Sequence, residues 1–184
     1  QGDVREHATA LTSCGATVSE VRTAAAIAQV DGLVIPGGES TTMSILAIKN
    51  NLFAPLRAAA RAGMPMYGSC AGLIMLADRI ADGRPDQETI GGLDITAARN
   101  AFGRQIDSFE TDVSMPAIGA QPYHAVFIRA PLVMDAGPEV EVLATVSRDG
   151  EDRPVAVRQG RLLATSFHPE LTSDLRVHQL FVDT

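Results

Sequence analysis

The sequence is poor in aromatic residues and has no long hydrophobic run. Among its 184 residues there is no tryptophan, and aromatic residues make up 4% of the chain. Hydrophobic residues make up 46%, so a core built from Ala, Val, Leu and Ile is expected, and the length fits a single domain over residues 1–184. No run approaches the roughly 20 apolar residues that span a bilayer, and the charged residues 1–30 do not resemble a signal peptide.

Positive charge and cysteine are also scarce. There are 15 Lys and Arg against 22 Asp and Glu, which gives a net charge of −7. This acidic balance, spread along the chain, argues against nucleic acid and anionic membranes as partners. Only Cys14 and Cys70 are present, so we expect a reduced, cytoplasmic protein. Metal-ligand residues with zinc-like spacing are absent, and we expect no metal.

The first half of the chain alternates strand-like and helical patterns. Ser40 is expected to cap the third helix and Gly63 to end the fourth. Helices are predicted for residues 3–15, 24–29, 40–50, 53–63 and 71–81, and strands for residues 16–22, 30–36 and 64–69. Such alternation predicts an α/β three-layer sandwich, in which helices flank both faces of a mostly parallel, flavodoxin-like sheet.

The second half has a different pattern. Residues 82–92 are polar and Gly-rich and predict a loop. A closing helix is predicted within residues 171–184, with Thr172 or Ser173 as its cap. Between them, strand-like segments with short turns predict a small antiparallel region, at 93–100, 108–115, 124–130, 139–146, 154–160 and 161–167.

The segment "GSCAG", residues 68–72, leads from a predicted strand directly into a predicted helix. This is the pattern of a nucleophile elbow with cysteine in place of serine. Cys70 would then stand at a helix N-terminus, where free N–H groups favour the thiolate, and the N–H of Ala71 would face a developing oxyanion. The alternative is a buried structural cysteine in a Gly-containing turn.

Two further segments add to this hypothesis. In "SFHPE", an extended backbone would point His168 and Glu170 to the same side, so that the carboxylate could orient the imidazole. An ordinary surface turn is the alternative. In "PGGES", the backbone around Gly37 and Gly38 could supply a second oxyanion donor, although two glycines after a strand also suit a simple turn.

Six segments together resemble one family. They are "QGDVREH", "VDGLVIPGGESTTM", "GSCAGLI", "RNAFGRQIDSFE", "FIRAP" and "SFHPELT", in this order over nearly the whole chain. They are similar to the glutaminase subunits of pyridoxal 5′-phosphate synthase, which are class I, triad-type glutamine amidotransferases. The family begins with a short strand before its "QG". The chain instead opens at Gln1 and stops inside a helical pattern, so we expect both ends to be incomplete.

The resemblance implies a function. Cys70, His168 and Glu170 would form the catalytic triad that hydrolyses L-glutamine, with Gly38 and Ala71 at the oxyanion hole. No cofactor is implied. The ammonia would pass to a separate synthase subunit that folds as a (β/α)8 barrel. Positions of the family that contact glutamine correspond to the following residues: Gly38, Glu39, Ser40, Arg99, Ile128 and Arg129.

The other candidate residues have simpler interpretations. Cys14 is expected to be a small buried residue, while His7 and His178 are expected on helices, exposed or packed. His7 belongs to the "REH" segment, which could face the synthase. His124 has no carboxylate close to it in the sequence.

Three alternatives to this function remain open from the sequence. The first is a glutaminase of another amidotransferase, such as that of histidine biosynthesis. The second is an elbow-cysteine protein that acts on peptides or small carbonyl compounds. The third is a regulatory binding module of the same fold without catalysis.

Overall fold

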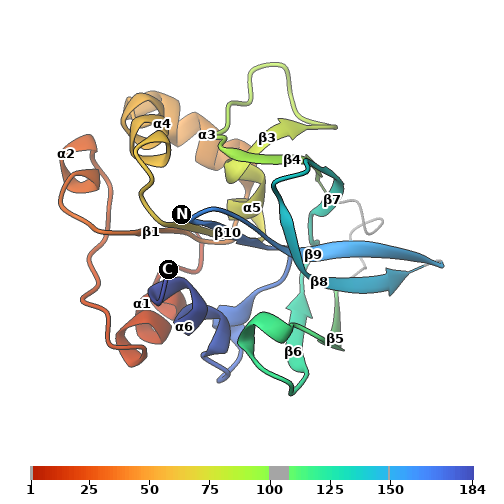
Figure 1. Ribbon diagram of the computed structural model, residues 1–184. Coiled ribbons are helices and arrows are strands. Elements are labelled where there is room, and N and C mark those ends of the chain that lie inside the picture. Colours follow the sequence, from red (N-terminus) through yellow and green to blue (C-terminus); the bar gives the residue numbers. More distant parts are fainter. Residues whose placement is uncertain (1, 100–107, 149) are drawn as a thin grey trace.

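The computed structural model describes residues 2–99, 108–148 and 150–184 (Figure 1). A sheet of five strands crosses the molecule in the order β1-β2-β10-β9-β8. Its strands are β1 (Leu33–Ile35), β2 (Met66–Ser69), β10 (Leu162–Thr165), β9 (Glu151–Gln159) and β8 (Glu141–Arg148). The first three run parallel, and β9 pairs antiparallel with β10 on one side and with β8 on the other. The predicted α/β fold is therefore confirmed, with a mixed sheet that is parallel around β2.

Helices lie on both faces of this sheet (Figure 1). On one side are α2 (Ala24–Ile27), α3 (Ser40–Lys49), α4 (Phe53–Arg61) and α5 (Ala71–Leu76). On the other are α1 (Val4–Ser13) and α6 (Arg176–Val182), which pack against each other. Short 3-10 turns cover Pro116–Ile118 (η1) and Pro169–Leu171 (η2). The helices thus form the two outer layers of the expected sandwich.

Two smaller sheets extend this framework. One has the order β3-β4-β7, formed by Ala77–Ile80, Leu93–Ala98 and Leu132–Ala136, with β3 and β4 parallel. The other is the antiparallel pair β5 (Phe109–Val113) and β6 (Tyr123–Phe127). Strands β4, β5 and β6 overlap segments that the sequence predicts as strands, whereas β3 and β7 are not among the predicted strands.

Strand β2 separates the two halves of the core. Successive side chains of a strand point to opposite faces. Met66 accordingly joins a cluster with Phe53 and Leu73 on one face, whereas Tyr67 joins Val177 and Phe181 on the other. Because residues of β2 are buried on both faces, the strand is a rigid support for the residue that follows it, Cys70.

Several predicted elements are wrong in their details. Residues 16–22 form no strand: Val18 is exposed, and only Ala16 and Val21 pack against the core, at the two ends of the segment. The helix predicted for residues 71–81 ends at Leu76, because the next four residues pair with β4. Glu39 rather than Ser40 caps α3, through bonds from the N–H groups of Thr41 and Thr42.

The cap predicted for the C-terminal helix is wrong as well. Helix α6 begins at Arg176 with Leu175 at the cap position and no side-chain cap. The Thr172 hydroxyl lies instead near the Tyr123 hydroxyl and donates to the Pro169 carbonyl. Among the described residues, no helix is long and apolar enough to cross a membrane.

The burial of α5 generates a stability prediction. Leu73 is fully buried, whereas Leu46 on α3 is 42% exposed. Leu73→Ala should lower the free energy of unfolding by about 2–5 kcal/mol, through lost burial and the cavity it leaves. Leu46→Ala, the matched control, should change it by less than about 1 kcal/mol. Urea unfolding of both variants measures this, and equal effects would contradict the assigned burial.

Candidate active site

Cys70 occupies a strained turn between β2 and α5. Its φ of 49° and ψ of −107° lie outside the regions that non-glycine residues ordinarily adopt. The backbone N–H of Cys70 donates to the Thr165 carbonyl of the neighbouring β10 at 2.8 Å, which anchors the turn to the sheet. Such strain in a non-glycine residue is typical of functional sites, and here it matches the predicted elbow.

Close packing explains the two glycines of the elbow. A Cβ on Gly68 would meet the carbonyl group of Gly72 at 2.4 Å, and a Cβ on Gly72 would meet the Ile35 carbonyl oxygen at 2.0 Å. Only glycine fits at either position, because backbone atoms cannot move away easily. The start of α5 is therefore pressed against both β1 and β2, which fixes the position of Cys70 between them.

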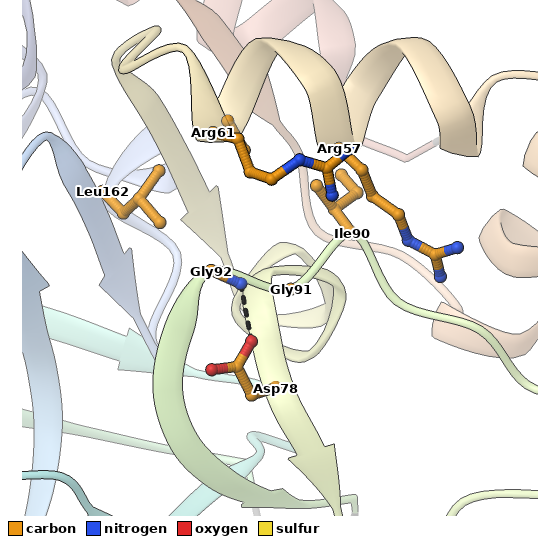
Figure 2. Close-up of a pocket in the computed structure, with 8 residues that line it drawn as sticks. Arg57, Arg61, Asp78, Ile90, Gly91, Gly92 and Leu162 are labelled. Carbon is orange, nitrogen blue, oxygen red and sulfur yellow. Dashed lines mark hydrogen bonds between the residues drawn. The ribbon is translucent and has the colours of Figure 1, made fainter.

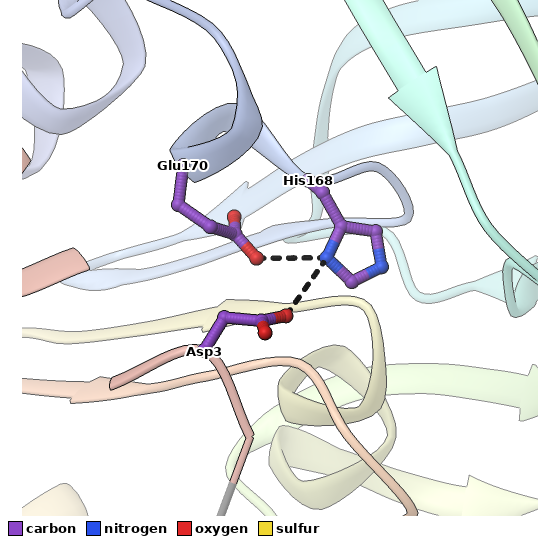
Figure 3. A group of neighbouring side chains, drawn as sticks. All are labelled: Asp3, His168 and Glu170. Carbon is purple, nitrogen blue, oxygen red and sulfur yellow. Dashed lines mark hydrogen bonds and ion pairs between the residues drawn. The ribbon is translucent and has the colours of Figure 1, made fainter. Parts of the chain in front are cut away.

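His168 and Glu170 form a buried pair, and both residues lie directly after β10. The Nδ1 atom of His168 lies 2.7 Å from Glu170 Oε1 (Figure 3). The predicted extended segment is wrong, since Pro169–Leu171 form a 3-10 turn. The turn still brings the carboxylate to the imidazole, and the bond leaves Nε2 as the nitrogen that is available to a thiol.

The electrostatics of the pair favour a charged imidazole. Burial alone would lower the pKa of His168, but interactions with Cys70 and Glu170 outweigh burial and raise that pKa to about 10. The buried Nε2 atom of His168 has no hydrogen-bond partner among the described residues. The Cys70 thiol is nevertheless one of the groups that raise the pKa of His168. Loose contacts of this kind are common in catalytic sites without a bound substrate. A positive imidazole beside a cysteine is the arrangement that activates sulfur as a nucleophile.

The N-terminal segment and the glycine loop close over the pair. Asp3 Oδ2 lies 3.8 Å from His168 Nδ1 (Figure 3). A Cβ on Gly37 would meet His168 Cε1 at 2.6 Å. Asp3, His168 and Glu170 hold three potential ligand atoms within 4.8 Å of one another. Both carboxylates face Nδ1, so they are placed as ion-pair partners of a protonated His168.

The other predicted site residues lie in two groups. In the first, Arg99 Nη1 donates to Thr41 Oγ1 at 2.7 Å and to Gln87 Oε1 at 2.9 Å, and Gln87 donates to Ser40 Oγ at 3.1 Å. This network joins the start of α3, which Glu39 caps, to the loop 82–92. Residues 100–107 of the "RNAFGRQIDSFE" segment lie outside the described residues.

The second group lies across from the cysteine. The carbonyl oxygen of Ile128 is 3.9 Å from Cys70 Sγ. Arg129 has a φ of 45°, in the left-handed region that non-glycine residues rarely adopt. A strained turn therefore follows β6 and lies beside the sulfur, just as a strained turn at Cys70 follows β2. Ile128 and Arg129 are themselves exposed.

A surface cavity of about 500 Å³ lies elsewhere on the molecule (Figure 2). Arg57 and Arg61 of α4 lie over it, and Gly92 donates to Asp78 at its base. Arg57 is already engaged by the Thr89 carbonyl and by Glu88. Cys70 does not line this cavity, so we assign no part of the site to it.

The surroundings of Glu170 include two histidines to which the sequence assigned no role in the site. His7, expected to be exposed or packed and able to face a partner, is packed; its Nε2 lies 2.9 Å from Ser69 Oγ and 3.3 Å from Glu170 Oε2. Its Nδ1 lies 3.0 Å from Nε2 of the buried His178. Helical spacing could have revealed this, because His7, Ala10 and Leu11 share the buried face of α1.

Two other predictions were incomplete. Cys14 is half-buried rather than buried. His124 has no carboxylate nearby in the sequence, but pairing of β5 with β6 places Glu110 and Asp112 at 2.9 and 3.0 Å from its ring nitrogens. These exposed groups raise the pKa of His124.

A cysteine on an elbow, an imidazole and a carboxylate that holds the imidazole make up the machinery of nucleophilic acyl transfer. The model of the SNO glutamine amidotransferase family matches residues 1–184. The chain therefore belongs to the SNO glutamine amidotransferase family.

Similar proteins support this assignment. Pyridoxal 5′-phosphate synthase subunit PdxT of Frankia alni is 62% identical, over 100% of this chain and 90% of that protein. The protein of the same name from Streptomyces avermitilis is 59% identical, over 100% and 89%. A crystal structure described as a glutamine amidotransferase superposes with a TM-score of 0.91 at 44% identity, covering 100% of this chain and 94% of that one. The fold is shared with the structure of PurLQS from Thermotoga maritima, at a TM-score of 0.65 and 17% identity, covering 97% and 91%.

The interaction of Cys70 with His168 can be tested by titration. Cys70→Ala should lower the pKa of His168 below about 10, because it removes one of the groups that raise it. Cys14→Ala, which changes the distant cysteine, should leave that pKa in place. Nitrogen NMR of histidine-labelled protein follows the titration. An unchanged midpoint in Cys70→Ala would show that the two side chains do not interact.

Proposed function

We propose that the chain hydrolyses L-glutamine and delivers the ammonia to the synthase subunit of a pyridoxal 5′-phosphate synthase. The observation that carries this proposal is the buried His168–Glu170 pair beside the strained Cys70, in a chain that matches its family over its full length. The names of the similar proteins from Frankia and Streptomyces support the choice of synthase.

The first half of the reaction uses the proton on His168. With the imidazole charged, the Cys70 thiolate attacks the side-chain amide carbon of glutamine and forms a tetrahedral oxyanion. His168 then gives its proton to the departing nitrogen, the C–N bond breaks, and ammonia leaves behind a γ-glutamyl thioester. Glu170 holds Nδ1 and stabilises the imidazolium throughout.

Water completes the cycle. The imidazole, now neutral, accepts a proton from a water molecule as its oxygen attacks the thioester carbon. The C–S bond breaks, glutamate leaves, and the thiolate–imidazolium pair is restored. We assign the oxyanion to two donors: the N–H of Ala71, in the first turn of α5 where no helical acceptor is available, and an N–H of the Gly37–Gly38 loop.

The substrate must open the site as it enters. Cys70 is only 7% exposed, and the sulfur is covered by the Ile128 carbonyl. We propose that docking of a (β/α)8-barrel synthase subunit moves the glycine loop, where Gly38 has a φ of 141°, and so completes the oxyanion hole. Without that partner the chain would be poorly active.

Recognition of free glutamine requires donors for a carboxylate and acceptors for an ammonium group. We assign these contacts to Gly38, Glu39 and Ser40 at the start of α3, to Arg99, and to Ile128 and Arg129. The bond from Arg99 to Thr41 already places the guanidinium beside the start of α3.

An electrophilic glutamine analogue tests the nucleophile. Incubated with the chain and its synthase subunit, it should modify Cys70 and leave Cys14 untouched, because Cys70 alone stands beside His168. Peptide mass spectrometry identifies the modified residue, and omission of the synthase should slow the modification. Modification of Cys14, or of neither cysteine with the synthase present, would contradict the proposal.

Removal of the sulfur should separate the two half-reactions. Cys70→Ala should reduce glutamine-dependent synthesis of pyridoxal 5′-phosphate by about 10³-fold or more, because the covalent route is lost. Synthesis fed with ammonium salts should be unchanged, since the synthase then needs no glutaminase. Absorbance of the product measures both, and equal loss in both assays would mean that Cys70 acts structurally.

A further inference from the structure

Two histidines that the proposed reaction does not use lie buried behind Glu170. His7 comes from α1 and is 3% exposed; His178 comes from α6 and is fully buried. Their ring nitrogens, His7 Nδ1 and His178 Nε2, are 3.0 Å apart. The other nitrogen of His7, Nε2, lies 3.3 Å from Glu170 Oε2. A series of neighbouring polar side chains therefore runs from Cys70 through His168, Glu170 and His7 to His178, which lies on α6.

Glu170 needs such a neighbour. Its Oε1 atom is bonded to His168, but its buried Oε2 atom makes no hydrogen bond of ordinary geometry among the described residues. An isolated carboxylate oxygen in the interior is unfavourable unless a positive or N–H group faces it. The polar atom of His7 that lies nearest to Oε2 is Nε2, and it is also 2.9 Å from Ser69 Oγ.

The groups around the two histidines determine where their protons lie. Burial lowers the pKa of His7 to about 3, with further contributions from His178 and His168, and burial lowers the pKa of His178 to about 4. Both rings are therefore neutral at neutral pH. The remaining groups against His7 are Tyr67 and Ser69 from β2, and the Tyr67 ring meets both imidazoles edge-on.

Two arrangements of the neutral rings are possible, and one suits the carboxylate better. If His7 carried its proton on Nδ1, its Nε2 lone pair could accept from the Ser69 hydroxyl but would also face the carboxylate oxygen, and His178 would keep a buried N–H on Nδ1 without a partner among the described residues. If both protons lie on Nε2, His178 donates to His7, and the His7 N–H lies toward Ser69 Oγ and Glu170 Oε2. The nitrogen without a partner is then His178 Nδ1, which carries only a lone pair. A buried lone pair without a partner costs less than a buried N–H without one together with a lone pair that faces a carboxylate.

We infer that His7 is a positioning residue for the reaction: its Nε2–H donates to Ser69 Oγ and lies 3.3 Å from Oε2 of Glu170, where its partial positive charge holds that carboxylate in place, while His178 fixes the tautomer of His7. This inference rests on the proposed function, because it extends the line Cys70, His168, Glu170 by one residue. The role is structural support for the carboxylate, and neither histidine touches the substrate.

Two substitutions separate this role from simple core packing. His7→Gln retains an N–H donor at about the reach of Nε2, whereas His7→Leu fills the space without a donor. In the complex with the synthase, His7→Leu should lower kcat for glutamine hydrolysis about tenfold, a typical effect of removing a group that orients a reacting residue, with KM changed less than about twofold. His7→Gln should keep most of kcat. His124→Leu, which changes an exposed histidine, is the control and should retain full activity.

Nitrogen NMR on the free, histidine-labelled chain tests the same inference without glutamine. In the wild-type chain, His7 and His178 should both be neutral with the proton on Nε2 between about pH 5 and about pH 8. The proton on Nδ1 of His168, strongly deshielded by its bond to Glu170, should remain visible in His7→Gln and be lost or broadened in His7→Leu.

The outcomes distinguish the inference from the proposed function. Equal kcat for the Leu and Gln variants, or a proton on Nδ1 of His7, would overturn the positioning role. If His7→Leu does not fold, the tautomers of the wild-type chain and the kcat of His7→Gln decide the question. If the wild-type complex releases no ammonia from glutamine, the proposed function fails, while the NMR result still decides whether His7 holds Glu170.

Discussion

The bond between His168 and Glu170 is the interaction on which the site depends. Both side chains are buried, so neither can rely on water for its charge, and each compensates the other. The bond fixes which nitrogen of the imidazole faces the cysteine, and it helps to keep that ring protonated despite burial. The geometry of this bond is determined by a short turn after β10, and the position of Cys70 is determined by a turn after β2. Since β2 and β10 are neighbours in parallel register, the two turns emerge at the same edge of the sheet.

The parallel pairing of β2 with β10 thus brings Cys70 and the His168–Glu170 pair, which are far apart in the sequence, into one site. The carboxyl ends of adjacent parallel strands are the usual place for ligands in open α/β sheets. β1 ends in the glycine loop, β2 in the elbow, and β10 in the His-Pro-Glu turn. Strand β9, which is antiparallel to both of its neighbours, and strand β8 supply none of the residues that we assign to the site, and they widen the core instead. This division explains how a mixed sheet can still present a single reactive edge.

The sequence was sufficient to predict the elbow at Cys70, the pairing of His168 with Glu170 and the α/β class, because each is a local pattern with few structural interpretations. It failed where long-range contacts decide the outcome. Ala77–Ile80 reads as helix but pairs with β4, and Val18 reads as part of a strand but finds no partner face. The contact of His7 with His178 could not be predicted, because the two residues lie 171 positions apart in the chain. A single histidine on a helix carries no mark of such a neighbour.

The two-residue alternation in β2 has a consequence for how the chain can change. Met66 and Tyr67 must each meet a different half of the core, and the nucleophile follows only three residues after Tyr67. Inserting or deleting one residue there would exchange the two faces and rotate the elbow away from its imidazole. Length variation is therefore barred from this strand, and Gln87, bonded to Ser40 and Arg99, limits it in the loop 82–92 as well. Chimaeras with other members of the family would accordingly join best away from both segments.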